Sequence, residues 1–263
     1  MPKDNTLLDR DGVRLTVDDT VANVTLTNPA KRNAQSFALW RALAEAGRLL
    51  PGQVRVVVLR GEGLSFSAGL DRQAFTPEGF DGEPSFLDLA RYPEQELDSV
   101  IARYQEAFTW WRRTDVITVA AVQGHAIGAG FQLALACDLR VCADDVQFAM
   151  RETSLGLVPD LTGTKSLVDL VGYARALEIC VTGRFVRAAE AERIGLATVV
   201  VPAAELDATV KDLVAGLLTA PRAAVNETKA LLLSARHNTP AEQHAAEREA
   251  QGRRLRDLAG LGE

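Results

Sequence analysis

The stretch from Val116 to Gly130, VITVAAVQGHAIGAG, decides the fold that we predict. Its first half, Val116–Val122, is apolar except for Thr118 and rich in β-branched residues, which is typical of a strand covered on both faces. Its second half, Gly124–Gly130, is a glycine-rich turn that opens a helix reaching about Cys137. The first turn of a helix leaves backbone N–H groups without partners and favours negative charge, so this turn can present donors to a ligand.

The same pattern occurs earlier in the chain. Val54–Leu59 (VRVVVL) predicts another buried strand, and Gly61–Asp71 is the glycine-rich turn that follows it. Gly69 permits backbone angles that other residues resist, which can aim the N–H of Leu70 at a ligand. Ligands gather where such loops leave the strands of an open α/β sheet. Two converging donors, one at Leu70 and one at Ala129, would form an oxyanion hole, each contributing about 3–4 kcal/mol to transition-state stabilisation.

Other interpretations of these turns are weaker. Each glycine turn can be only a tight turn, and that alternative stays open. A dinucleotide fingerprint fails at Gly128–Gly130, because Leu133 stands where the third glycine belongs. The sequence has no Walker loop and no Gly-x-Ser-x-Gly elbow. The histidines, His125, His237 and His244, have no evident partners for a serine triad, and we interpret His125 as a packed or hydrogen-bonded loop residue.

Strands, loops and helices alternate along the rest of the chain. We expect a hairpin formed by residues 15–17 and 21–26, and further strands at 139–142, 147–150 and 197–201. We expect one helix at 36–50, a second that follows residue 95 and ends near 113, a third at 221–236 and a last one that begins at 239. Ser36 caps the first helix, and residues 72–95, rich in Pro and Gly, predict a mobile or lid-like segment. This order predicts an α/β fold of ββα units, with a core over 1–200 and a helical region over 201–263.

Composition excludes several classes of protein. The 263 residues are 47% hydrophobic and 24% charged, as in ordinary globular proteins. The net charge of −6 argues against a nucleic-acid partner, which would need a dominant basic face. Cys137, Cys142 and Cys180 lie in apolar segments without metal-ligand spacing, which indicates buried thiols in a reducing compartment and no bound metal. Neither a signal core nor a membrane-length apolar run is present, so we expect a cytoplasmic protein.

Several motifs occur together in a recognisable order. They are Asn28–Ala34 (NPAKRNA), Phe66–Asp71 (FSAGLD), Gly124–Gly130 (GHAIGAG), and then Glu152, Gly156 and Pro159. With them the chain resembles the enoyl-CoA hydratase/isomerase family, also called the crotonase family, over nearly its whole length. The resemblance implies a β/β/α spiral core and a helical C-terminal region that packs in homotrimers, often paired into hexamers. It also implies that Leu70 and Ala129 supply the two N–H groups of the oxyanion hole.

The resemblance further implies where the substrate, an acyl-CoA of fatty acid metabolism, is bound. It places the adenine end of coenzyme A near Arg32, Ala34 and Ala68. Lys229 matches a basic position that meets the nucleotide phosphates in family members, although a helix lysine is most often simply solvated. Asp71, Gly128 and Pro159 lie within the matching motifs and are further candidates for substrate contacts. No cofactor is expected beyond the coenzyme A of the substrate, and no membrane partner.

The candidate catalytic residues depart from the pattern of the family's hydratases, which use two glutamates. At the first position this chain has Gln132, whose amide can position water but cannot accept a proton at neutral pH. The second is present as Glu152, a plausible general base if burial lifts its pKa; the alternative is a surface carboxylate paired with Arg151. Asp160 matches an acid of the family's dienoyl-CoA isomerases, although these also carry an acid at the Gln132 position, which this chain lacks. Alternatively, Asp160 caps a helix near Thr162 or Gly163.

These residues favour double-bond isomerisation of an unsaturated acyl-CoA, with Glu152 moving the proton and Asp160 as a second acid. One alternative is a hydratase, a lyase reaction in which Gln132 holds the water. Another is an acyl-CoA-binding protein without catalysis, in which Glu152 is held in an ion pair. A third is another thioester reaction, such as hydrolysis, because the same oxyanion hole would serve it.

Overall fold

The computed structural model describes residues 5–80 and 82–261, and within them the strands form two sheets. The larger has the order β1-β2-β3-β4-β5-β7-β10, and the smaller has the order β6-β8-β9. The strands are β1 (Thr6–Arg10), β2 (Val13–Asp18), β3 (Val21–Leu26), β4 (Val56–Gly61), β5 (Ile117–Val122), β6 (His125–Ile127), β7 (Leu139–Ala143), β8 (Gln147–Ala149), β9 (Val186–Arg187) and β10 (Val199–Val201). The polar N-terminal residues 1–4, on which we based the expected absence of a signal segment, lie outside the described residues.

Parallel strands form the centre of the larger sheet. β3 pairs with β4, β4 with β5 and β5 with β7, all in parallel, while β1, β2 and β3 pair antiparallel. The carboxyl ends of β4 and β5 therefore lie at the same edge of the sheet, and the two glycine-rich turns leave from that edge. The predicted hairpin and both predicted buried strands are confirmed.

Both faces of the central strands are covered. Val57 and Leu59 of β4 belong to the main core, whereas Val56 and Val58 face a second cluster that includes residues of α8 (Leu206–Thr219). This two-sided burial is why the strand is a continuous β-branched run. The boundary that we predicted at residue 200 falls inside β10, and α8 packs on the sheet.

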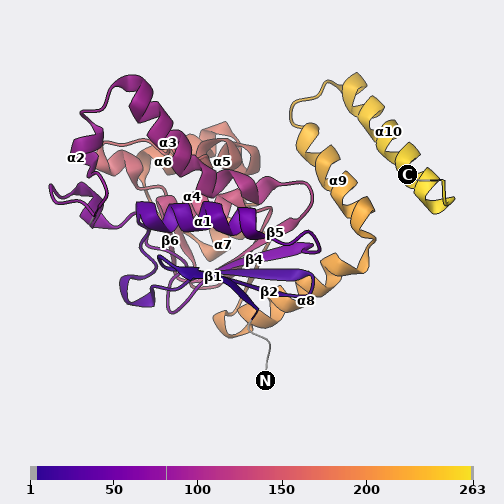
Figure 1. The fold of residues 1–263 in the computed structure, drawn as a ribbon, viewed down its shortest axis with the longest axis horizontal. Coiled ribbons are helices and arrows are strands. Elements are labelled where there is room, and N and C mark those ends of the chain that lie inside the picture. The colour runs from indigo at the N-terminus through magenta and orange to yellow at the C-terminus, as the bar shows by residue number, and fades with distance from the viewer. Residues whose placement is uncertain (1–4, 81, 262–263) are drawn as a thin grey trace.

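The helices begin largely where their capping residues predict. Ser36 caps α1, its hydroxyl accepting the N–H of Leu39, and Thr239 forms a capping box with Glu242 at the start of α10. The helices are α1 (Phe37–Leu49), α2 (Phe86–Leu89), α3 (Glu94–Thr109), α4 (Ala129–Ala136), α5 (Gly163–Val171), α6 (Tyr173–Thr182), α7 (Ala188–Arg193), α8, α9 (Arg222–Ser234) and α10 (Pro240–Leu258). Figure 1 shows α9 and α10 as a pair of helices that stands out from the body of the molecule.

Three regions differ from the prediction. The edge strand β1 was not predicted, and the turn at 124–130 contains the short strand β6. Residues 72–95 contain helical turns, and the ring of Phe86 packs against those of Phe37 on α1 and Phe75. Cys180 is only partly buried, unlike the other two cysteines, which are buried as predicted.

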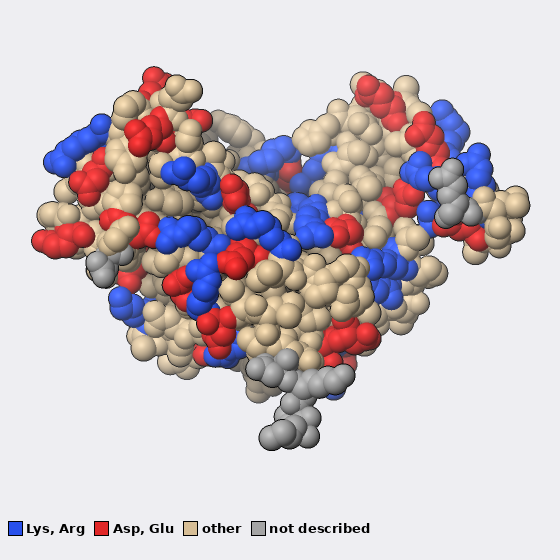
Figure 2. All heavy atoms as spheres, in the orientation of Figure 1, with Lys and Arg blue, Asp and Glu red and all other residues tan. Residues whose placement is uncertain are grey.

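The C-terminal helices leave a hollow against the body of the protein. A hollow of about 580 Å³ is lined by residues of the body, of α9 and of the segment just after α9, among them Arg112, Lys165 and Arg236. Figure 2 shows the notch between the body and the C-terminal helices, with Lys and Arg side chains near its floor. Across the described ranges, none of the helices combines the length and the apolarity needed to cross a membrane.

Candidate active site

The two glycine-rich turns lie side by side, as predicted. Ser67 pairs with Ala126 in a parallel bridge, in which the N–H of Ser67 donates to His125 O (2.9 Å) and the N–H of Ile127 donates to Ser67 O (3.0 Å). Gly69 has a φ of +82°, and a Cβ there would overlap Ile127 O and lie 3.4 Å from Ala129 N. The backbone of the first turn therefore touches that of the second without room for a side chain between them.

The peptide bonds on either side fix the direction of the Leu70 N–H. Gly69 O accepts the N–H of Gln35 (2.7 Å), and the N–H of Asp71 donates to Gln35 O (2.8 Å). Because a trans peptide points its C=O and the following N–H in opposite directions, the N–H of Leu70 points away from Gln35.

The second predicted donor lies at the start of α4. Ala129 is the first residue of this helix, so its N–H has no intrahelical acceptor. Gly128 O accepts the N–H of Gln132 (2.9 Å) as the first bond of the helix, which directs the N–H of Ala129 back out of the helix start. Gly128 has a φ of +52° and a ψ of −119°, a backbone conformation that favours glycine.

Glu152 lies directly beside this second donor. A Cβ on Gly128 would lie 3.3 Å from Glu152 Oε1, so the carboxyl group covers the residue that precedes Ala129. Burial raises the pKa of Glu152, hydrogen bonds that include one from Gln132 oppose the rise, and the charge of Asp160 adds to it. The other oxygen, Oε2, is buried and has no hydrogen-bond partner in residues 5–80 and 82–261.

Gln132 holds the carboxyl group of Glu152. The side chain is fully buried, and its Nε2 donates to Glu152 Oε1 (2.7 Å). Its Oε1 accepts two backbone N–H groups, from Leu161 (2.9 Å) and Gly163 (3.2 Å). Both lone pairs of the amide oxygen are therefore occupied, which leaves it no capacity to accept a bond from water.

Asp160 does not cap a helix. The N-cap of α5 is Thr162, without a side-chain capping bond, and the nearby N–H groups of Leu161 and Gly163 are taken by Gln132. The capping alternative is therefore wrong. Burial raises the pKa of Asp160, and its charge in turn raises the pKa of Glu152, so the two carboxyl groups interact.

The ion pair expected for a non-catalytic Glu152 is not formed. The guanidinium of Arg151 donates to Gly183 O (2.9 Å), and among the described residues no ion pair involves Glu152. His125 is hydrogen-bonded as predicted, with its Nδ1 3.2 Å from the hydroxyl of Ser65, but it lies at the start of β6 and not in a loop.

The residues expected around the adenine lie next to the first turn. The N–H of Ala68 donates to Arg32 O (2.8 Å), and Arg32 is exposed in a left-handed conformation, with a φ of +51°. Ala34 is half-buried. Asp71 accepts the N–H of Gln73 (3.0 Å) and pairs with Lys31 (2.9 Å), so its carboxylate is engaged within the protein.

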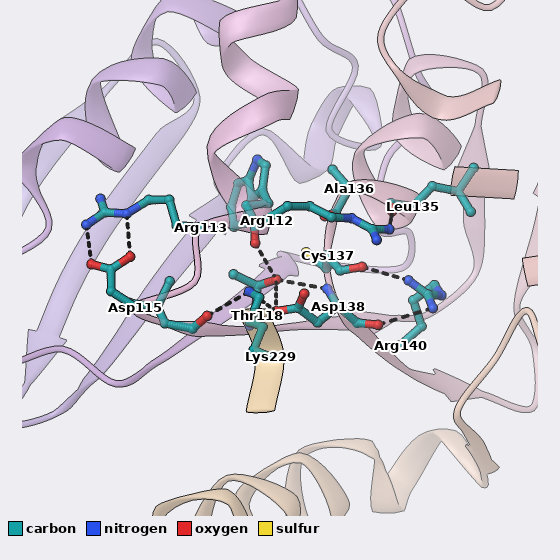
Figure 3. A network of polar contacts seen from close by, with 12 residues as sticks. Arg112, Arg113, Asp115, Thr118, Leu135, Ala136, Cys137, Asp138, Arg140 and Lys229 are labelled. Atoms are coloured by element: carbon teal, nitrogen blue, oxygen red, sulfur yellow. Dashed lines mark hydrogen bonds and ion pairs between the residues drawn. The ribbon is translucent and has the colours of Figure 1, made fainter. Parts of the chain in front are cut away.

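Lys229 does not reach the site, and it is not a solvated helix lysine either. Its ammonium group is buried and donates to Asp138 Oδ2 (2.6 Å) and Val116 O (2.8 Å). The same carboxyl oxygen accepts the N–H (2.8 Å) and the hydroxyl (3.1 Å) of Thr118, as Figure 3 shows. Lys229 therefore ties α9 to the ends of β5 and β7.

Sequence reasoning missed the buried polar residues behind the first turn. Asn33, Gln35 and Ser67 have no exposed surface. The sequence feature that could have identified them is their position, because each is a polar residue next to a predicted core segment. The ion pair between Lys31 and Asp71 was also not predicted, although Lys31 lies inside the 28–34 motif and its ammonium group is exposed.

Comparisons with known proteins show the family and the fold of this chain. The sequence model of the enoyl-CoA hydratase/isomerase family matches residues 16–256. The mitochondrial Delta(3,5)-Delta(2,4)-dienoyl-CoA isomerase of Homo sapiens is 35% identical over 84% of this chain and 68% of its own length. A probable enoyl-CoA hydratase of Mycobacterium tuberculosis is 31% identical over 72% of this chain and 68% of its own. A Thermobifida fusca YX structure in complex with CoA, named as an enoyl-CoA hydratase, is 52% identical, covers 95% of both chains and has a TM-score of 0.90, which confirms the predicted fold.

Proposed function

Because the chain belongs to the enoyl-CoA hydratase/isomerase family, we propose that it shifts a double bond in an unsaturated acyl-CoA, with Glu152 as the base. The observation that carries this proposal is the state of the Glu152 carboxyl group. Burial raises its pKa, Gln132 fixes one oxygen, and the other oxygen has no partner within the described residues. Such an oxygen is suited to take a proton from carbon and return it.

The reaction begins when the thioester oxygen accepts the N–H groups of Leu70 and Ala129. Glu152 takes a proton from the carbon next to the thioester carbonyl. The electron pair of that C–H bond forms a double bond to the carbonyl carbon, and the π pair of the carbonyl moves onto the thioester oxygen. The resulting enolate is stabilised by both donors and by the dipole of α4. The enolate is then protonated at a more distant carbon, by Glu152 in a 1,3 shift or by Asp160 in a longer shift, and in the longer shift the proton on Glu152 must pass back to Asp160. The double bond moves and the composition of the substrate is unchanged.

The substrate class that we favour is a 3,5-dienoyl-CoA. The human relative, 35% identical to this chain, is named for conversion between Delta(3,5) and Delta(2,4) dienes. Such a shift moves a proton from C2 to C6, over a longer distance than a single carboxylate conveniently spans. Asp160, whose charge already acts on Glu152, is the second acid that we assign to the far end of the diene.

We assign the adenine end of coenzyme A to the exposed edge beside Arg32, Ala34 and Ala68. A Thermobifida fusca structure 52% identical to this chain binds CoA, which supports a CoA thioester as the substrate. Gly128 and Pro159 are assigned to the walls around the acyl group, because they lie next to Ala129 and Asp160.

We also propose a homotrimer, alone or paired into a hexamer. Figure 1 shows that α10 lies farther from the body than α9. Leu255 and Leu258 on α10 are 56% and 84% exposed, and burying them against neighbouring subunits would stabilise the assembly.

The proposal predicts that one purified sample isomerises a 3,5-dienoyl-CoA faster than it adds water to a 2-enoyl-CoA. We expect a ratio on the order of 10² in kcat/KM, because hydration lacks the second glutamate and general acid–base groups contribute ~10²–10⁴-fold each. Both rates are measured by absorbance of the conjugated thioester. Faster water addition would instead identify a hydratase, and binding without turnover would identify an acyl-CoA-binding protein.

The Asp160→Asn variant is expected to shift the acid limb of the kcat/KM profile to lower pH. The base must be ionised, so the rate falls as the pH falls through the raised pKa of Glu152. Removing the charge of Asp160 removes one cause of that raised pKa. The pH–rate profile of the variant is compared with that of Asp212→Asn, which alters an exposed residue of α8. A limb that stays in place or moves upward would show that the two carboxyl groups are not coupled.

A further inference from the structure

A chain of buried hydrogen bonds runs beneath the first donor turn. Gln35 and Ser67 have no exposed surface, and Trp40 is almost completely buried. The indole N–H of Trp40 donates to Gln35 Oε1 (2.7 Å), and Gln35 Nε2 donates to Ser67 Oγ (3.0 Å). The chain therefore connects the first turn of α1 to the loop that carries Leu70.

The hydroxyl of Ser67 is fully used. It donates to Asn33 O (2.8 Å) and accepts both Gln35 Nε2 and the N–H of Gly69 (3.2 Å). A hydroxyl has one donor and two acceptor positions, so all its capacity is satisfied. The N–H of Gly69 is therefore held by the Ser67 hydroxyl, which has no free position for another partner.

The backbone of Gln35 holds the other side of the same turn. Its N–H donates to Gly69 O, and its C=O accepts the N–H of Asp71. Gly69 is therefore held at its N–H by Ser67 and at its C=O by Gln35, and this C=O belongs to the peptide bond that carries the N–H of Leu70. Gly69 has a φ of +82°, so without these bonds the glycine has many other conformations available.

We propose that Ser67, held by Gln35 and Trp40, is a positioning residue for the N–H of Leu70. This inference rests on the proposed function only in taking that N–H as a donor to the thioester oxygen. A donor stabilises the developing oxyanion only when it is already aimed at it, and a displacement of about 1 Å costs on the order of 10² in rate. Ser67 lies behind the donor and acts through Gly69, without touching the substrate.

The test is Ser67→Ala, examined with a chromophoric substrate analogue, a cinnamoyl-CoA with an electron-donating ring substituent. Such a thioester absorbs at longer wavelength when its carbonyl oxygen is polarised by hydrogen bonds. We expect a smaller red shift on binding and a kcat lower by on the order of 10–10²-fold, with KM nearly unchanged. The matched control is Ser65→Ala, which removes a buried hydroxyl of the same loop that faces His125.

Two further variants keep the test decisive if Ser67→Ala folds poorly. Trp40→Phe removes only the far donor and keeps a ring against Phe37 and Tyr104, and Gln35→Met removes both amide bonds at similar length. Each should reduce the red shift in the same direction. An unchanged red shift in these variants and in Ser67→Ala would overturn the positioning role of Ser67 without contradicting the proposed isomerase function. A red shift in the wild type that depends on Ser67, without isomerisation, would support the positioning role and reject only the proposed reaction.

Discussion

Glu152→Gln is expected to lower the isomerase kcat about 10³-fold, with little change in KM. The amide has nearly the shape of the carboxylate, and its oxygen can still accept the bond from Gln132 Nε2. It cannot accept a proton from carbon, so the proton transfer is lost while the thioester still meets the N–H groups of Leu70 and Ala129. Steady-state rates on a 3,5-dienoyl-CoA give kcat and KM separately.

The same substitution is expected to raise Tm at neutral pH. Burial raises the pKa of Glu152 in the folded state above its unfolded value. Above that folded pKa the native protein therefore holds a charge that costs desolvation energy, and this cost disappears below the unfolded pKa. Removing the charge should therefore stabilise the fold while it stops the reaction, as expected for a strained catalytic group.

Glu192→Gln, at an exposed position on α7, should change neither kcat nor Tm. The red shift of the chromophoric thioester should persist in Glu152→Gln, because the oxyanion donors are untouched. Unchanged isomerase turnover in Glu152→Gln would remove Glu152 from the mechanism. A loss of ligand binding together with activity would instead indicate a structural role.

The parts of the fold that sequence predicts are those with a local signal. Val54–Leu59 and Val116–Val122 are apolar except for Arg55 and Thr118 because neighbours cover both faces, and this pattern can be recognised from the local sequence alone. β1 has no such signal, since within Thr6–Arg10 only Leu8 is buried and the strand lies at the sheet edge. β6 has only three residues between two glycines, and it is a strand because Gln147–Ala149 and the single residue Ser67 pair with it.

The residues of the candidate site also differ in whether a local sequence pattern predicts them. Leu70 and Ala129 were predicted as donors because glycine-rich turns and a helix start are visible in a few consecutive residues. The contacts of Gln132 and Lys229 depend on residues distant in sequence. Gln132 accepts an N–H from Leu161, 29 positions away, and Lys229 pairs with Asp138, 91 positions away. A pattern along the chain identifies the type of side chain, but burial and partners come from the packing of separate elements.

Gly69→Ala is expected to lower kcat on the order of 10³-fold and to destabilise the protein by about 3 kcal/mol. The new Cβ would overlap Ile127 O, and a φ of +82° is unfavourable for alanine. The atoms that the new Cβ would meet belong to the backbone of the second turn. The two turns must therefore separate, because no flexible side chain can move away instead. Separation displaces the N–H of Leu70 from that of Ala129, and both donors lose their common target.

The matched control is Gly172→Ala, because it isolates the backbone strain from the overlap. Gly172 has a φ of +78°, and a Cβ there would meet nothing within 4 Å. With a ψ of 160°, Gly172 lies in a region that is essentially restricted to glycine, so this variant should lose about 1–3 kcal/mol of stability and keep its kcat. Thermal melts, rates on the dienoyl substrate and the thioester red shift are measured for both variants. If Gly69→Ala keeps both its red shift and its kcat, the close contact of the turns does not create the oxyanion hole, and the thioester must be polarised elsewhere.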